Sequence, residues 1–270
     1  MRRKYLSLIS FSAIAILLLA SCGGKKKSDP NHIIVGVESG PEYVVAQAAQ
    51  KVAKEKYGLD VELVQFNDFI MPNTALHQGD IDVNAYQHKP FLDDQIKQRE
   101  YKFAVVGRTF VYPLAGYSKK IKSIAELKDG STIVIPNDIT NGGRALLLLQ
   151  KAGLIKLSAQ SGAIPKVTDI TANPKNLKIM ELEAPQLPRV LDDEKVAIAV
   201  INNTFATQAG LLLKDGLFAE DKNSPYVNLI VSREDNKNEE KVKKFVQAFQ
   251  SDEVAKTAEQ VFKGGAVKGW

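Results

Sequence analysis

The side chains that could most plainly bind an ion follow a short apolar run. Residues 133–136 read as a buried strand, and a polar turn then leads through Asn141 and two glycines to Arg144 at the start of a helix. Asn141 is a candidate N-cap, because its side-chain oxygen can accept a bond from a free N–H of the first turn. A cation at that end faces the positive pole of the helix dipole, and a bound anion would relieve this conflict. The stretch therefore predicts an anion site at Arg144, and the alternative is a surface arginine paired with an acidic neighbour.

Other side chains of interest fall at the ends of predicted strands, where open parallel sheets bind ligands. The first half of the chain places aromatic rings there, and the second half places amides. They are Phe66, Phe69, Tyr86 and His88 in the first half, and Asn141 and Asn202 beside Arg144 in the second. Arg144 can give two hydrogen bonds to a carboxylate, and amides suit an α-amino and α-carboxyl pair. The set predicts a ligand with an apolar side chain and a charged head.

The same residues also fit structural roles. Phe66 and Phe69 could belong to the core, Tyr112 could pack a crossing strand, and Asn202 could cap a helix. His88 has no second ligand at metal spacing, so no metal is expected. The chain holds no G-x-S-x-G elbow, P-loop, H-E-x-x-H motif or dinucleotide fingerprint, so neither an enzyme nor a cofactor is expected.

Alternating strands and helices must position these residues. An apolar run at 33–37, a helix over 42–56 and a second run at 61–66 form a βαβ unit, which favours a parallel sheet. The alternation continues, so the fold class is α/β with mostly parallel sheets. Two sheets are expected, with 103–117 carrying the chain from a first lobe to a second and 226–231 carrying it back.

The amino-terminal end reads as an export and anchoring signal. Three basic residues precede a largely apolar run that is shorter than the roughly 20 residues of a membrane span. The run ends Leu-Ala-Ser-Cys at 19–22, which resembles a bacterial lipobox and implies that Cys22 is lipidated after removal of a signal peptide over 1–21. The alternative is an ordinary free thiol. Residues 22–31 are rich in Gly, Lys and Ser and read as a flexible tether.

Composition limits the partners. The net charge is +5, but the signal peptide contributes three basic residues and no acidic one, which leaves +2. No basic patch with interleaved aromatics is present, so nucleic acid is not expected. With one cysteine there is no internal disulfide, and the mature chain of about 240 residues is long enough to bury its own core.

Longer motifs make the chain resemble a known family. They are 86–93 (YQHKPFLD), polar positions within 136–144, 183–189 (EAPQLPR), 199–202 (AVIN), 224–230 (SPYVNLI) and 264–270 (GGAVKGW). With the lipobox they cover nearly the whole chain, which resembles the NlpA family, the methionine-binding lipoproteins of bacterial ABC importers. The resemblance implies a two-lobed, periplasmic-binding-protein-like fold of type II with two crossover strands. Lobe 1 would comprise 32–115 and 231–270, and lobe 2 would comprise 116–230.

The resemblance also implies a ligand and roles for residues. The ligand would be L-methionine, with D-methionine or methionine derivatives as further candidates. A lipid-anchored monomer facing the periplasm or the cell exterior would deliver it to a membrane permease and its ATPase. The polar contacts would be Arg144 on the carboxylate with Asn141, Asn202 and Asn228, and the thioether cage would be Phe66, Phe69, Tyr86, His88 and Tyr112. Asn228 is identified by the resemblance alone.

Two alternatives to a methionine-binding lipoprotein remain open, apart from the enzyme that is not expected. One is a binding lipoprotein for another apolar amino acid or a short peptide. The other is an envelope surface antigen or adhesin that retains the fold without transport.

Overall fold

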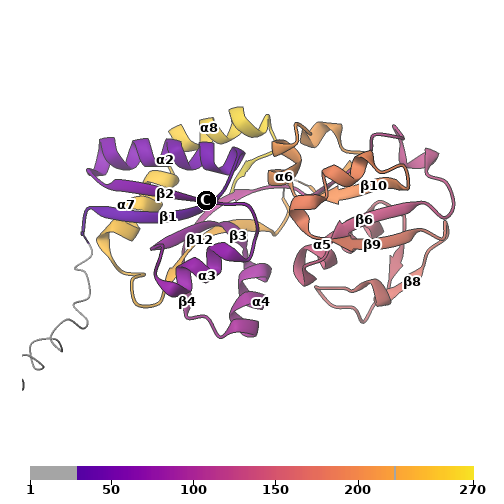
Figure 1. Ribbon diagram of the computed structural model, residues 1–270, viewed down its shortest axis with the longest axis horizontal. Coiled ribbons are helices and arrows are strands. Elements are labelled where there is room, and N and C mark those ends of the chain that lie inside the picture. The colour runs from indigo at the N-terminus through magenta and orange to yellow at the C-terminus, as the bar shows by residue number, and fades with distance from the viewer. Residues whose placement is uncertain (1–28, 222) are drawn as a thin grey trace, which may run out of the picture.

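The computed structural model describes residues 29–221 and 223–270, which fold around two large β-sheets placed side by side (Figure 1). The predicted signal peptide and Cys22 lie outside the described residues. In the part of the chain that is described, no helix combines the length and the apolar character needed to cross a membrane.

The first sheet has the strand order β13-β4-β12-β3-β1-β2. Its strands are β1 (His32–Glu38), β2 (Asp60–Phe66), β3 (Val83–His88), β4 (Phe103–Val111), β12 (Val227–Arg233) and β13 (Val267–Lys268). Its helices are α2 (Pro41–Tyr57), α3 (Met71–Gln78), α4 (Lys89–Arg99), α7 (Glu240–Phe249) and α8 (Asp252–Phe262). We call this sheet with its helices the first lobe.

The second sheet has the strand order β11-β5-β10-β6-β9. Its strands are β5 (Ala115–Tyr117), β6 (Thr132–Pro136), β9 (Lys178–Leu182), β10 (Val196–Ile201) and β11 (Phe218–Ala219). The helices here are α5 (Ile139–Lys151) and α6 (Asn203–Gln208), and β7 (Lys156–Leu157) pairs with β8 (Ile170–Ala172) in a small separate sheet. We call this group the second lobe.

Strand direction differs from the expectation of mostly parallel sheets. β1 is parallel to β2 and β3, and β6 is parallel to β9 and β10. By contrast, β12 is antiparallel to β3 and β4, and β5 is antiparallel to β10 and β11. A βαβ step keeps the chain direction, whereas β5 and β12 enter their sheets from the other lobe and run the opposite way. The predicted α/β class with two sheets is confirmed, and within it both sheets are mixed rather than mostly parallel.

Two segments connect the lobes. β4 ends at Val111 in the first sheet and β5 begins at Ala115 in the second, so only 112–114 lie between the two sheets. The chain returns between the end of β11 and the start of β12 at Val227. The expected lobe limits lay at 115/116 and 230/231, whereas Ala115 belongs to a strand of the second sheet and 227–230 belong to a strand of the first. We therefore propose that the connecting segments 112–114 and 220–226 separate the two lobes.

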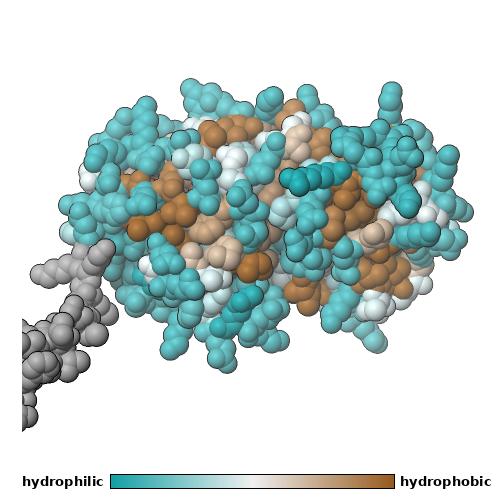
Figure 2. Space-filling view, in the orientation of Figure 1, coloured by the Kyte–Doolittle hydropathy of each residue, from teal (hydrophilic) through white to brown (hydrophobic). Residues whose placement is uncertain are grey.

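Each lobe buries its own core. Helices α2, α7 and α8 cover one face of the first sheet, where Val45 and Phe245 are fully buried. On α5 in the second lobe, Leu146 and Leu149 pack against Ile133 of β6. The visible surface is mostly hydrophilic, with apolar patches scattered over it (Figure 2). The lobes can therefore fold as separate cores, which leaves the space between them for a site.

Gly36 in β1 allows two side chains to approach the first sheet closely. A Cβ at this position would lie 2.6 Å from Ile81 Cδ1 and 2.9 Å from a ring carbon of Phe66. Phe66 is half-buried and packs against the buried cluster that contains Leu76 and Ile81. Its ring is therefore part of the core of the first lobe.

We expect Gly36→Ala to lower the free energy of unfolding by about 1–3 kcal/mol, because the added methyl group overpacks this contact. Urea unfolding of the variant beside the unaltered protein measures the change. Coincident unfolding curves would contradict the close packing at Gly36.

Candidate ligand-binding site

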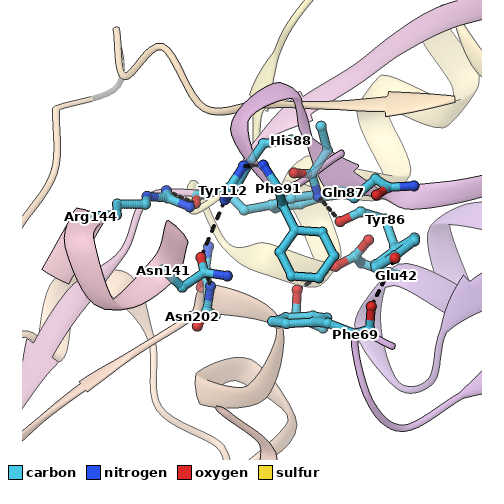
Figure 3. Close-up of a pocket in the computed structure, with 13 residues that line it drawn as sticks. Glu42, Phe69, Tyr86, Gln87, His88, Phe91, Tyr112, Asn141, Arg144 and Asn202 are labelled. Carbon is cyan, nitrogen blue, oxygen red and sulfur yellow. Dashed lines mark hydrogen bonds between the residues drawn. The ribbon is translucent and has the colours of Figure 1, made fainter. Parts of the chain in front are cut away.

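A cavity lies between the lobes, beyond the ends of strands from both sheets (Figure 3). Its lining residues are Glu42, Phe69, Tyr86, Gln87, His88, Phe91, Tyr112, Asn141, Arg144, Asn202, Asn203, Thr204 and Asn228. Phe69 is half-buried and all the others are buried. A ligand in this cavity would be enclosed by protein, so its entry requires the lobes to separate.

The structure brings eight of the nine predicted site residues to this cavity. They are Phe69, Tyr86, His88, Tyr112, Asn141, Arg144, Asn202 and Asn228. Phe66 does not line it, because its ring turns to Gly36 and Ile81 in the core of the first lobe. The structural alternative for Phe66 is thus the one that the geometry favours.

Helix α5 begins earlier than the sequence suggested. Its N-cap is Asp138, whose Oδ1 accepts from the backbone N–H of Asn141 at 2.9 Å and from the Thr140 hydroxyl at 3.0 Å. Asn141 therefore lies within the first turn, and the prediction that it is the N-cap was wrong. Arg144 lies in the second turn of α5. Its guanidinium is therefore not held against the free N–H groups of the first turn, and the expected conflict with the helix dipole does not arise.

Arg144 is buried and binds groups from both connecting segments. Its Nε donates to Glu220 Oε1 at 2.7 Å, and its Nη2 donates to Oε2 at 2.5 Å. Nη2 also donates to the Tyr112 carbonyl at 3.0 Å, and the guanidinium lies 4.3 Å from the centre of the Tyr226 ring. Among the described residues, Nη1 has no hydrogen-bond partner. The acidic neighbour considered for this arginine is present, and Nη1 is the donor that remains for a ligand.

Both the amide nitrogen and the amide oxygen of the Asn141 side chain are hydrogen-bonded to neighbouring side chains. Its Nδ2 donates to both carboxylate oxygens of Asp138, at 3.0 and 3.1 Å. Its Oδ1 accepts from Asn202 Nδ2 at 2.9 Å and lies 3.3 Å from His88 Nε2. Asn202 Oδ1 is buried and has no hydrogen-bond partner in the described part of the chain. Asn202, rather than Asn141, thus keeps a free acceptor for a ligand.

His88 is neutral in this site. Burial and the nearby Arg144 charge lower the pKa of its imidazole to about 3, although the Asn141 contact opposes the shift. Its Nδ1 accepts from the Phe91 backbone N–H at 3.2 Å, so Nε2 carries the proton and donates to Asn141. His88 therefore brings a polar ring edge and no second cation to the cavity.

Aromatic rings of the first lobe line the other part of the cavity, and Phe205 of the second lobe packs against one of them. The Phe69 ring lies 6.1 Å from those of Tyr86 and Phe91 and 5.0 Å from that of Phe205, measured between centroids. The Tyr86 hydroxyl donates to the Phe69 carbonyl at 2.9 Å, so this hydroxyl is satisfied within the protein. The rings together offer an apolar surface for a side chain.

Sequence reasoning missed several lining residues. Phe91 stands within the 86–93 motif and three residues after His88, so helical spacing could have identified it. Glu42 and Thr204 meet from opposite lobes, and no spacing in the sequence brings them together. Glu220 was missed for the same reason. Among the described residues, no group of three or more histidine, cysteine, aspartate or glutamate side chains could hold a metal ion.

Two mixed α/β lobes joined by two connections, with a buried cavity between them, define the class of bilobal substrate-binding proteins. The NlpA lipoprotein family profile matches residues 33–270, and the chain belongs to that family.

Individual relatives agree with this assignment. The chain is 66% identical over 266 residues to the D-methionine-binding lipoprotein MetQ of Salmonella typhimurium, covering 97% of this chain and 98% of the relative. A crystal structure of the methionine-binding protein MetQ superposes with a TM-score of 0.88 at 68% identity, covering 90% of this chain and 99% of that one. A nutrient-binding protein from Burkholderia cenocepacia bound to methionine has a TM-score of 0.85 at 49% identity, covering 88% and 100%.

The pairing of Arg144 with Glu220 gives a stability prediction. Their side chains are only 4% and 10% exposed, so Arg144→Ala leaves a carboxylate buried without its partner. We expect the free energy of unfolding to fall by about 3–5 kcal/mol. Lys119→Ala is the matched control, because the Lys119–Asp192 pair is half-exposed or more and should contribute less than about 1 kcal/mol. Urea unfolding compares them, and similar losses in both would contradict a special role for the buried pair.

Proposed function

We propose that this protein is a lipid-anchored solute-binding protein that captures methionine and delivers it to an ABC import permease and its ATPase. L-methionine is the leading ligand, and D-methionine is the second. The observation that supports the proposal is the buried cavity between the lobes, which combines Arg144 and the free amide oxygen of Asn202 with a group of aromatic rings.

The charged head of an amino acid fits the groups left free by the protein. Arg144 Nη1 would donate to the α-carboxylate as a charge-assisted hydrogen bond. Asn202 Oδ1 would accept from the α-ammonium group. Asn228 would contribute from β12, where its Nδ2 already donates to the Tyr86 carbonyl at 2.6 Å. These contacts need an ammonium and a carboxylate on one carbon, which selects a free α-amino acid.

The thioether side chain fits the aromatic part of the cavity. Phe69, Tyr86 and Phe91 offer ring faces and edges, and a polarisable sulfur gains from such contacts beyond its burial. His88 and Tyr112 complete the enclosure. The similarity to a D-methionine-binding lipoprotein and to a nutrient-binding protein bound to methionine supports this ligand over other apolar amino acids.

The proposed lipid anchor is supported by the family and by the amino-terminal sequence rather than by the cavity. The family is one of lipoproteins, and the lipobox ends at Cys22, which would carry the lipid. An acylated cysteine would hold the protein at a membrane surface on the periplasmic or outer side, with the tether spanning the gap to the first lobe. A monomer suffices, because both lobes of one chain build the cavity.

Ligand-dependent stabilisation tests the ligand. L-methionine at about a thousandfold above its Kd should raise the free energy of unfolding by about 4 kcal/mol, because it binds only the folded state. Norleucine tests the sulfur and methionine methyl ester tests the carboxylate contact, so both should stabilise less. Protein freed of co-purified ligand by unfolding and refolding is required. No shift with either methionine enantiomer would refute the proposed ligand.

Substitutions of Phe69 and Phe66 distinguish a residue that contacts the ligand from one that packs in the core of the first lobe. Phe69→Ala should weaken methionine binding by about tenfold to a hundredfold, since a buried aromatic contact contributes about 1.5–3 kcal/mol. Phe66→Ala should lower the free energy of unfolding and leave the affinity of the folded protein unchanged, because Phe66 packs beside Gly36. Calorimetric titration and urea unfolding of both variants measure this. If Phe66→Ala weakened methionine binding and Phe69→Ala did not, Phe66 rather than Phe69 would be the residue that contacts the methionine side chain.

A further inference from the structure

Helix α6 of the second lobe is hydrogen-bonded to the first lobe by three of its side chains. The Thr204 hydroxyl donates to Glu42 Oε1 at the start of α2. Asn203 Nδ2 donates to the Gly265 carbonyl at 2.6 Å, and Gln208 Nε2 donates to the Ser39 carbonyl at 2.5 Å. We call these three bonds the interlobe latch. Figure 1 shows α6 at the inner edge of the second lobe, facing the first.

Two glycines allow this close approach. A Cβ at Gly40 would lie 2.6 Å from Gln208 Cγ, and one at Gly265 would lie 2.8 Å from Asn203 Nδ2. Gly40 also has a φ of 78°, which disfavours other residues. The surfaces of the two lobes are thus closely matched in the closed arrangement.

Glu42 differs from the other members of the latch because it can ionise, and it lines the cavity together with Asn203 and Thr204. It is 5% exposed, and among the described residues no cation pairs with it. Burial raises the pKa of its carboxyl to about 8, with the Thr204 bond opposing the shift. Glu42 is therefore mostly protonated at neutral pH while the lobes are closed.

The neighbours of Glu42 do not supply a compensating charge. Burial, with Glu42 and Asp68 nearby, raises the pKa of Glu38 well above its usual range, which favours its neutral form. Burial likewise raises the pKa of Tyr112. His88 stays neutral above a pKa of about 3, and Arg144 is paired with Glu220. Glu42 lines the cavity and Glu38 does not.

We propose that Glu42 closes the lobes as a neutral carboxyl bonded to Thr204, and that ligand capture takes up a proton at this residue. The inference rests on the proposed function, since closure over a ligand is what the proton accompanies. Opening would break the bond to Thr204 and admit water, which returns the carboxyl pKa toward its ordinary value of 4.5. Between that value and about 8, the open state loses its proton and the closed state keeps it. Affinity should therefore be greatest at low pH, fall as the pH rises and level off above about 8.

Calorimetric titration with L-methionine between about pH 5.5 and 8 tests this linkage. Each pH unit should weaken binding by up to about tenfold, which is the most that one proton allows. Titrations in buffers of different protonation enthalpy should detect uptake of up to one proton. Glu42→Gln retains an acceptor for Thr204 and cannot ionise, so its affinity should not depend on pH and its proton uptake should vanish. Glu55→Gln is the matched control, because Glu55 is exposed on the same helix, and it should keep the unaltered pH dependence.

Thr204→Val provides a second variant that keeps the shape of the side chain and removes its hydroxyl. It should bind more weakly at pH 5.5 because the bond is lost, and its dependence on pH should be at least as large, because the hydroxyl opposes the rise in the Glu42 pKa. A pH dependence that persists in Glu42→Gln would overturn the proposal. So would an affinity that rises with pH in the unaltered protein, since that result would place a carboxylate against the ligand ammonium.

Amide hydrogen exchange of α6 without ligand separates this proposal from the identity of the ligand. After correction for intrinsic rates, protection of 203–208 should fall between about pH 6 and 8 in the unaltered protein and stay constant in Glu42→Gln. If neither methionine enantiomer binds at any pH, the proposed ligand fails and the exchange result still decides the latch. If the protection of α6 depended equally on pH in the unaltered protein and in Glu42→Gln, the proposed role of Glu42 in the latch would be overturned.

Discussion

The connections between the lobes meet at one buried ion pair. Arg144 on α5 binds Glu220 on the returning segment and the Tyr112 carbonyl on the outgoing one, and Glu220 Oε2 also accepts from the Leu114 N–H at 3.0 Å. Two charges taken out of water are tolerated only when their remaining donors and acceptors are also bonded. The pair therefore fixes α5 against both connections. Arg144 lines the cavity while it is held in this way.

The cavity shows how hydrogen-bond capacity decides which residues can recognise a ligand. Asn141 lies at its centre, but Asp138, Asn202 and His88 use its amide completely. This network fixes the orientation of Asn202, whose own Oδ1 stays free. A residue can therefore line a cavity and still act only through its neighbours, and a list of lining residues does not by itself identify the ligand contacts.

The second lobe closes on the first through polar contacts that are weak individually. A hydrogen bond contributes only about 0.5–1.5 kcal/mol net, so the three bonds of the latch can form and break as ligand arrives and leaves. The cores of the lobes are separate, so this motion need not disturb either of them. The cavity and the latch share Glu42, which couples capture of a solute to the state of one carboxyl group.

The sequence by itself determined the alternation of strands and helices, the two-lobed fold through its family motifs, and a set of nine site residues, eight of which line the cavity. Local patterns, strand-end positions and the family motifs are together sufficient for these features. Only the tertiary structure decided that Phe66 belongs to the core, that both sheets are mixed, and that Glu220 and Glu42 face Arg144 and Thr204. These outcomes depend on contacts between residues far apart in the chain. Their partners are set by the packing of one lobe on the other, which no local spacing encodes.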